Sequence, residues 1–312
     1  MKLQNQRQDK VNFLVCVKRT KWQRDIERYG NAKEVRRLYR LQNNIFRKVY
    51  SSHLRQRQSE LTLKAALAHR ADFIYRDDLS AELVKNYQTL VSLGGDNHFT
   101  YVARFAGSTP VIGVNSDPLT SSGNLVYFNT ASFLKAIQGT DFFDHIEQWT
   151  LIEGEIETEN NEIIKTGPCI SETGIRNSFA DAMSRYYIRV NDEPWEEQKS
   201  SGLLLSTGTG STGWFQSCLP HTMQVYEDPT FGRSEQIFKF VAREPGFHRQ
   251  HFYRYLYRTL GSDDTVEIIS EMDGQIIVDA QPETSFDFNP GSRCRFQLSK
   301  NHLQVIRPKE HA

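Results

Sequence analysis

The sequence predicts two folded parts, an N-terminal α/β domain and a C-terminal domain built mainly of antiparallel strands. Up to about residue 128, short apolar runs alternate with helical segments, as in a doubly wound α/β layer. Beyond that point, short segments alternate apolar and polar residues and are separated by Asn, Gly, Pro and Asp turns. A length of 312 residues accommodates two domains of ordinary size.

The first domain is expected to begin with a buried strand, because Val11 to Val17 is a short, apolar, β-rich run. From Val35 onward, apolar residues recur every three to five positions and predict one amphipathic helix. These residues are Val35, Leu38, Leu41, Ile45, Val49 and Leu54. The Arg and Lys residues of its other face either form a phosphate-binding surface or are simply solvated, as charged helix faces usually are.

Three further strands are expected in the first domain, at Phe73–Tyr75, Thr89–Leu93 and Thr109–Asn115. The second runs directly into Gly94–Phe99, and the third ends in a turn of Gly, Asn, Ser and Asp. Ligands of α/β sheets gather at the carboxyl ends of the strands. Both turns are therefore candidate binding loops.

The second domain is expected to consist of short, half-buried strands. The alternating segments are 150–157, 186–190, 265–270, 275–278 and 293–298. No internal repeat or low-complexity segment interrupts them. We place the first domain at residues 1–128 and the second at 129–286.

The composition indicates a globular protein without an electrostatic pull toward nucleic acid or membranes. Hydrophobic residues make up 38% of the chain, and no stretch approaches the roughly 18 apolar residues of a membrane-spanning helix. The 38 Lys and Arg residues balance the 38 Asp and Glu residues, so no net positive field exists. We expect neither nucleic acid nor a membrane as a partner.

The cysteines and the N-terminal residues favour a reducing compartment. Cys16, Cys169, Cys218 and Cys294 are far apart and form no C-x-x-C pair, which argues against a zinc signature and a secreted disulfide framework. Met1–Lys10 lacks the apolar core of a signal peptide and makes a poor transit peptide. We therefore expect a cytoplasmic location.

The segment Ser206–Trp214 reads Ser-Thr-Gly-Thr-Gly-Ser-Thr-Gly-Trp and directly follows three leucines. Its small residues let backbone N–H groups and hydroxyls close on an anionic or sugar-bearing ligand. A flexible turn is the alternative, but the preceding apolar strand and the closing Trp favour a binding loop.

Gly94-Gly95-Asp96 is a second candidate loop at the end of a strand. The glycines allow close approach of a ligand, and the carboxylate can accept a proton from an attacking hydroxyl or hold Mg²⁺ on a nucleotide. A plain Asp-containing turn is the alternative. Together, the two loops would enclose a ribose and phosphates.

These motifs together resemble the ATP-dependent NAD kinase family, and most closely its mitochondrial-type branch and that branch's bacterial relatives. The resemblance covers about Val11 to Ile306. Besides the two loops it rests on the Gly113–Pro118 turn, the Lys199–Leu203 lead-in, the Glu271–Gly274 turn and Asp287–Gly291.

The resemblance implies a two-domain NAD-kinase-like fold, with a Rossmann-like α/β domain completed by the tail 287–312 and an antiparallel β-rich domain. It implies transfer of a phosphoryl group from ATP, with Mg²⁺, to the 2′-hydroxyl of the adenosine ribose of NAD, giving NADP. NAD and ATP would be bound in the crevice between the domains. It also implies a homodimer or larger homo-oligomer.

The resemblance assigns site residues position by position. Asp96 matches the catalytic carboxylate that orients and deprotonates the hydroxyl. The expected NAD-binding residues are Gly95, Asn97, Asn115, Asn177, Ser178, Thr212, Gly213, Trp214 and Ser217. The expected nucleotide- or phosphate-binding residues are Gly94, Gly95, His98, Thr209, Gly210 and Ser211, and no residue is assigned as a metal ligand.

Departures from the family pattern keep other functions open. Asn97-His98 replaces the usual Gly-Thr, Asn177-Ser178 lacks the acidic partner of the usual pair (which Asp181 would have to replace), and Ser201 replaces an Asp, as in the mitochondrial-type branch. One alternative is a degenerate NAD(P)(H)-binding sensor or scaffold. A kinase for another hydroxyl is the other, although the Ser206–Trp214 loop argues against it. The phosphoryl donor and the choice between NAD and NADH stay open.

Overall fold

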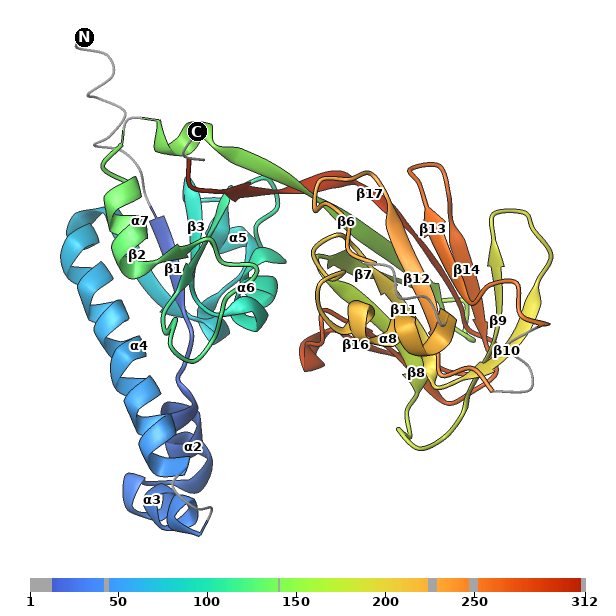
Figure 1. Cartoon of the computed structure of the whole chain (residues 1–312), viewed down its shortest axis with the longest axis horizontal. Coiled ribbons are helices and arrows are strands. Elements are labelled where there is room, and N and C mark those ends of the chain that lie inside the picture. Colours follow the sequence, from blue (N-terminus) through green and yellow to red (C-terminus); the bar gives the residue numbers. More distant parts are fainter. Residues whose placement is uncertain (1–12, 42–44, 140, 224–228, 247–251, 310–312) are drawn as a thin grey trace. The chain divides into compact units, whose positions relative to one another are not determined.

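Figure 1 shows the computed structural model, which describes residues 13–41, 45–139, 141–223, 229–246 and 252–309. The chain forms two compact units. Unit 1 comprises Met1–Glu147 and Gln304–Ala312, and unit 2 comprises Gln148–Leu303. No helix of the described part is long and apolar enough to cross a membrane.

Unit 1 is a parallel sheet with helices. Its strands are β1 (Phe13–Val17), β2 (Ala71–Tyr75), β3 (Thr89–Gly94), β4 (Val111–Asn115), the short β5 (Phe128–Asn129) and the last residues of β17 (Arg293–Ile306). They lie in the order β2-β1-β3-β4, with β5 and the end of β17 both parallel to β4. Every residue of β1, β3 and β4 is buried, as expected for strands covered on both faces.

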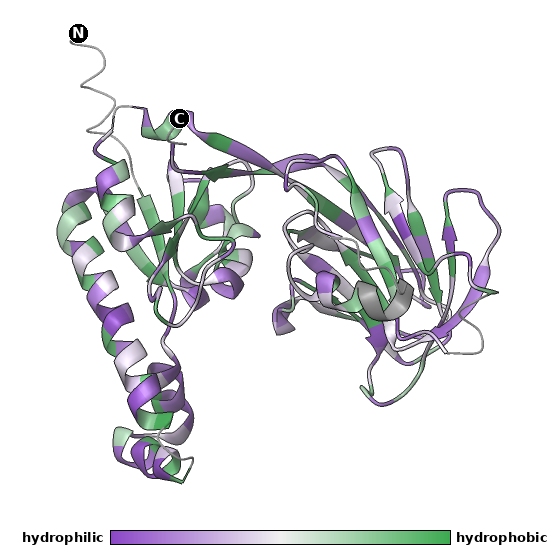
Figure 2. Ribbon diagram, in the orientation of Figure 1, coloured by the Kyte–Doolittle hydropathy of each residue, from purple (hydrophilic) through white to green (hydrophobic). Residues whose placement is uncertain are grey.

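The helices of unit 1 are α2 (Lys21–Tyr29), α3 (Ala32–Arg40), α4 (Ile45–Leu67), α5 (Ala81–Val84), α6 (Asp96–Ala103) and α7 (Thr130–Ala136). Short 3₁₀ turns lie at Ala68–Arg70, Arg76–Asp78 and Phe142–Asp144. Figure 2 shows mostly hydrophobic strands in this unit, whereas α4 mixes hydrophobic and hydrophilic residues along its length.

The prediction of a single helix from Val35 onward is wrong, because α3 ends at Arg40 and α4 begins at Ile45. The apolar spacing continues across the break because both helices bury side chains in one cluster around Trp22. That Trp belongs to α2, which the sequence reading missed. Thr20 and Gln23 form a capping box at its start and fix where it begins.

Unit 2 contains two layers of strands. Its elements are β6 (Ile146–Glu157), β7 (Ile163–Cys169), β8 (Glu172–Asn177), β9 (Ser184–Val190), β10 (Glu196–Ser200), β11 (Gly202–Ser206), α8 (Trp214–Met223), β12 (Phe238–Arg243), β13 (Tyr257–Leu260), β14 (Val266–Ser270), β15 (Gly274–Val278), a 3₁₀ turn (Pro282–Thr284), β16 (Ser285–Phe288) and most of β17.

One layer of unit 2 is the antiparallel sheet β13-β12-β11-β8-β15-β16. In the other layer, β10-β9-β14-β17 are antiparallel neighbours. β17 also pairs with β6, which in turn pairs with β7. Both layers contribute side chains to one apolar core, among them Ile175, Leu205, Ile268 and Phe296. The expected fold class, α/β plus antiparallel β, is confirmed.

The unit boundaries lie later than the expected residues 128 and 286. Residues 129–147 also belong to unit 1, because β5 pairs with β4 and Phe133 of α7 packs in the core of that unit. At the other end, β16 pairs with β15 and the first residues of β17 pair with β14, both in unit 2. Only Gln304–Ala312 of the tail therefore joins unit 1.

Candidate functional site

The Gly94-Gly95-Asp96 turn and the turn after β4 lie together at the carboxyl edge of the parallel sheet. Gly94 pairs in register with Asn115, and the backbone N–H of Ser116 donates to the carbonyl oxygen of Gly94. The two turns that the sequence marked as candidate binding loops therefore lie side by side within unit 1.

Asp96 is the first residue of α6, so the strand β3 passes into the helix through Gly95 alone and the candidate loop is a tight strand-to-helix junction. A Cβ atom on Gly94 would lie 2.6 to 2.9 Å from three atoms of the His98 side chain. Gly94 is itself buried. The expected phosphate contact of Gly94 is therefore revised: this glycine lets the helix start close to the strand.

The carboxylate of Asp96 is held by two backbone N–H groups. Asn124 donates to Oδ2 and Leu125 donates to Oδ1, each at 2.9 Å. A carboxylate has about four acceptor positions on its two oxygens, so each oxygen can accept one more hydrogen bond. Asp96 is partly exposed, and its orientation is fixed.

His98 lies beneath this turn and not at its surface. Its side chain is 0% exposed. Nε of Arg76 donates to Nδ1 at 2.9 Å, so the ring proton is on Nε2, which faces the carbonyl oxygen of Cys16 at 3.0 Å. Burial lowers the pKa of His98 to about 3, and the charges of Arg76 and Lys18 act in the same direction. The expected phosphate contact of His98 is incompatible with this burial.

The neutral state of His98 predicts a loss of stability in acid. The unfolded chain takes up the proton near the ordinary histidine pKa of about 6.5, whereas the folded chain does so only near 3. Stability is therefore lost as the pH falls below about 7, by about 2 kcal/mol between pH 7 and pH 5. The measurement is urea unfolding of wild type and His98→Gln across this range. The difference between the two proteins should change by that amount, and a constant difference would contradict the assignment.

The other predicted residues near Asp96 differ in exposure. Asn97 is exposed and Gly95 partly exposed, so both remain available to a ligand. Asn115 is only 6% exposed, and both ends of its amide are engaged: Nδ2 donates to the carbonyl oxygen of Ser121, and Oδ1 accepts from the N–H of Asp117. The expected NAD contact of Asn115 is revised, because its side chain builds the turn after β4.

The first six residues of the Ser206–Trp214 loop form a buried turn. The side chains of Ser206, Thr207, Thr209 and Ser211 are at most 3% exposed. The hydroxyl of Thr207 donates to the carbonyl oxygen of Ile170 at 2.6 Å, and that of Ser211 donates to Gly208 at 2.8 Å. These hydroxyls close the turn instead of facing a ligand.

The glycines of this turn are required by close approach of other backbone. A Cβ on Gly208 would lie 2.2 Å from the carbonyl oxygen of Gly232, and one on Gly210 would lie 2.3 Å from that of Ser171. Phosphate contacts of Thr209, Gly210 and Ser211 were expected from the sequence. They are revised, because all three residues are buried.

The exposed end of the loop begins at Thr212. Thr212, Gly213, Trp214 and Ser217 are all exposed, and α8 begins at Trp214. The indole of Trp214 is 41% exposed, and the guanidinium of Arg243 lies 4.3 Å from the centre of its ring. These four predicted residues form a surface that a ligand can reach.

A pocket of about 440 Å³ adjoins Trp214 in unit 2. It follows from strand alternation: Ile175 of β8 points into the core, so its neighbours on the strand face outward. Gly174 lacks a side chain, which leaves space beside the indole. The lining residues are Glu172, Gly174, Arg176, Trp214, Gln275, Ile277, Ala280, Pro282 and Ser285. An aromatic wall, an acid, a base and an apolar floor suit a flat heterocycle with polar edges.

Glu172 is the site residue that the sequence reading missed. It pairs with Ser206 across β8 and β11, directly before the loop, and it lines the pocket. Burial, and then the charge of Asp279, raise the pKa of Glu172 to about 7. Its Oε2 has no hydrogen-bond partner among the described residues. No local signal in the sequence marks this residue, because only the pairing of β8 with β11 places it beside the three-leucine strand.

Asn177 and Ser178 lie at the other end of β8. Five residues of strand, about 16 Å, separate Asn177 from Glu172. The amide of Asn177 is used in the hairpin to β9, since Oδ1 accepts from the N–H of Phe179. Ser178 and Asp181 are exposed.

Comparisons with known proteins agree with the resemblance seen in the sequence. No family model matches. NAD kinase 2, mitochondrial, of Homo sapiens is 31% identical over 195 residues, 50% of this chain and 44% of the relative. An NAD kinase from Archaeoglobus fulgidus in complex with ATP superposes with a TM-score of 0.60 at 17% identity, covering 78% of this chain and 88% of that one. Yeast NADH kinase complexed with NADH gives 0.69 at 13%, covering 96% and 84%.

The chain spans just under half the length of the first curated relatives that it matches. The similarity to NAD kinases is confirmed, and the fold is shared with the two solved structures.

Proposed function

We propose that this chain is an NAD kinase that transfers the terminal phosphoryl group of ATP to the 2′-hydroxyl of the adenosine ribose of NAD, giving NADP. The observation that carries the proposal is Asp96, a partly exposed carboxylate at the carboxyl edge of a parallel sheet, oriented by two N–H groups with acceptor positions left over. The similarity to NAD kinases supports it.

In this reaction Asp96 accepts a hydrogen bond from the 2′-hydroxyl and takes its proton as the hydroxyl oxygen attacks the terminal phosphorus. The bond from that phosphorus to the bridging oxygen breaks, and ADP leaves. Positioning and charge stabilisation carry most of such a transfer, because the protein forms no covalent bond. A fixed carboxylate meets the geometric requirement for a general base.

Mg²⁺ fits this site as a partner of ATP. Among the described residues, no three His, Cys, Asp or Glu side chains lie together as a metal cage. Mg²⁺ in kinases is held by one or two carboxylates and the substrate phosphates, and Asp96 is a partly exposed carboxylate at this edge. The ion would offset the negative charge of the phosphates.

We assign the dinucleotide to the exposed surface of unit 2. The Trp214 indole and the apolar floor of the pocket suit one ring of NAD, and Glu172 and Arg176 offer an acceptor and a donor to its polar edges. Thr212, Gly213 and Ser217 lie exposed beside the ring.

The test is purified protein with NAD, ATP and Mg²⁺, assayed for NADP with an NADP-specific dehydrogenase. We expect NADP that depends on all three additions. Parallel reactions with NADH and with inorganic polyphosphate define the acceptor and donor. A folded sample that binds NAD and makes no NADP from any pair would contradict the proposal and favour the binding-only alternative.

That alternative is not favoured by the site. It rested on the changes at Asn97, His98 and Ser178. Of these, His98 supports the turn from beneath, so this departure preserves the position of Asp96. The homo-oligomeric assembly and the cytoplasmic location stay predictions.

Trp214→Ala is expected to raise the dissociation constant for NAD about 10-fold, because stacking on an aromatic ring contributes about 1–3 kcal/mol per base. Isothermal titration calorimetry measures it. Trp214→Tyr keeps an aromatic face and should stay within about threefold of wild type. Equal affinities of wild type and the Ala variant would remove Trp214 from the NAD site.

A further inference from the structure

The residues that hold Asp96 belong to one folded segment, Asn115–Leu125, which we call the 115–125 segment. It leaves the end of β4 and returns across the start of α6, where its last two N–H groups reach the carboxylate of Asp96. The Asn115 amide ties its start to Ser121. Gly123 has a φ of +69°, and a Cβ there would lie 2.7 Å from Nδ2 of Asn115. These contacts therefore hold the segment in a single backbone conformation.

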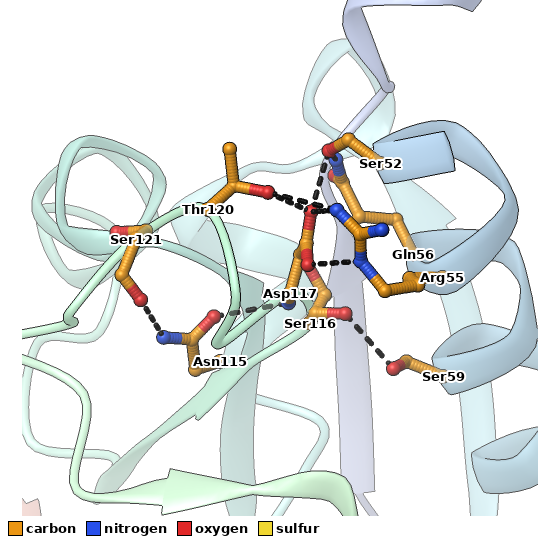
Figure 3. A network of polar contacts seen from close by, with 9 residues as sticks. All are labelled: Ser52, Arg55, Gln56, Ser59, Asn115, Ser116, Asp117, Thr120 and Ser121. Carbon is orange, nitrogen blue, oxygen red and sulfur yellow. Dashed lines mark hydrogen bonds and ion pairs between the residues drawn. The ribbon is translucent and has the colours of Figure 1, made fainter. Parts of the chain in front are cut away.

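Helix α4 clamps this segment through a bidentate ion pair (Figure 3). Nε of Arg55 donates to Oδ1 of Asp117 at 2.6 Å, and Nη2 donates to Oδ2 at 3.1 Å. The hydroxyl of Ser52 donates to Oδ2 at 2.6 Å, and that of Thr120 donates to the same oxygen. Arg55 also donates to the hydroxyl of Thr120 at 3.1 Å. One carboxylate thus joins the helix to the segment at Asp117 and at Thr120.

The contacts come from one polar stripe of α4. Ser52, Arg55, Gln56 and Ser59 recur at intervals of three and four residues, so they share a helix face. Ser59 adds a hydrogen bond of 2.9 Å to the carbonyl oxygen of Ser116. Where α4 contacts the segment, the surface of the helix is therefore polar and not apolar.

The carboxylate of the ion pair is withdrawn from water, since Asp117 is 5% exposed, whereas the Arg55 side chain is 38% exposed. Burial alone would raise the pKa of Asp117, but the hydrogen bonds from Arg55, Ser52 and Thr120 outweigh it and hold the pKa below its ordinary value. A bidentate pair whose carboxylate is buried and accepts further hydrogen bonds fixes geometry better than a fully exposed pair does.

We propose that Arg55 and Asp117 are positioning residues for phosphoryl transfer: α4 holds the 115–125 segment through them, and the segment holds Asp96 in the orientation in which it accepts the proton. This inference rests on the proposed function. Neither residue touches the reacting atoms. The path runs from Arg55 to Asp117, through the backbone of the segment, to the N–H groups of Asn124 and Leu125.

Arg55→Met and Asp117→Asn are expected to lower kcat about 10- to 100-fold, because a displacement of about 1 Å at a reacting group costs up to about 100-fold. KM for NAD and for ATP should change less than about threefold, because the Trp214 surface is untouched. Arg55→Lys keeps the charge and loses the bidentate geometry, so it should recover part of kcat.

The matched control is Arg57→Met on the same helix. Arg57 pairs with the buried Glu60, which keeps Lys64 as a partner in the variant. It removes an Arg ion pair from α4 without touching the segment, and kcat should stay within about twofold of wild type. An equal loss in this control would show that any weakening of α4 suffices and would overturn the proposal.

A double variant separates positioning from general damage. If Arg55 acts through Asp96, adding Arg55→Met to Asp96→Asn should lower the residual rate less than about twofold. Full multiplication of the two losses would overturn the proposal.

Hydrogen exchange of the Asn124 and Leu125 amides tests the link without relying on activity. Both should be protected in wild type and in Arg57→Met, and should exchange at least about 10-fold faster in Asp117→Asn, Arg55→Met and Asp96→Ala. Unchanged protection in the Asp117 and Arg55 variants would overturn the inference. Absence of NADP formation by wild type, with the exchange pattern as expected, would instead contradict the proposed function.

Discussion

Asp96→Asn is expected to lower kcat for NADP formation by about 100- to 10,000-fold, the usual contribution of a positioned general base. An amide cannot accept the proton of the 2′-hydroxyl. Its NH₂ group would also face one of the two backbone N–H donors that hold the carboxylate. Steady-state kinetics of NADP formation measure the loss, and calorimetry should show NAD affinity within about threefold of wild type.

The matched control for this substitution is Asp72→Asn. Asp72 is exposed on β2 of the same sheet, near the opposite end of the strands, and accepts from the hydroxyl of Tyr87. It loses the same charge from the same unit, and its kcat should match wild type. Undiminished activity of the Asp96 variant would remove Asp96 from the role of base.

Asp279→Ala is expected to lower the free energy of unfolding of unit 2 by about 3–5 kcal/mol. The Asp279 carboxylate is 4% exposed and accepts from the N–H groups of Ile170 and Ser171, at 2.7 to 3.1 Å. Each buried donor left without a partner costs about 1–3 kcal/mol. The same backbone carries the carbonyl oxygens to which Thr207 donates, so the buried turn would loosen too. Urea unfolding, followed by circular dichroism, measures the loss.

Two further variants assign the cause. Asp279→Asn keeps an acceptor oxygen and should lose less than half as much stability as the Ala variant. Asp263→Ala removes an exposed carboxylate of the same unit and should be neutral. Since Asp279 also raises the pKa of Glu172, both Asp279 variants should lower the pKa of Glu172 in ¹³C-detected titrations. Equal stability of Asp279→Ala and wild type would contradict this account.

The edge of the parallel sheet could be predicted from local signals. Each strand there is an apolar run that stops at a Gly, Asn or Asp, and parallel strands end at a common edge. Those two facts bring Asp96 and Asn115 together without knowledge of the fold. The exposed Thr212, Gly213, Trp214 and Ser217 followed from the same kind of reasoning, with the family pattern added.

What could not be predicted depends on partners far away in the chain. The hydroxyl of Thr207 is buried because the backbone of Ile170 reaches it, and Gly208 is required because Gly232 approaches it. A string of Gly, Ser and Thr contains no information about those neighbours. Glu172 was missed for the same reason, since only the pairing of β8 with β11 places it beside the loop.

The exposed indole at the start of α8 gives the molecule an optical reporter of its own. Trp22 and Trp149 are at most 5% exposed, whereas Trp214 is 41% exposed and stands under a guanidinium at the mouth of the pocket. A ligand ring that binds in the pocket would exclude water from the indole of Trp214, but not from those of Trp22 and Trp149. Its emission should shift to the blue, so intrinsic fluorescence would follow occupancy of the pocket in real time without any attached dye.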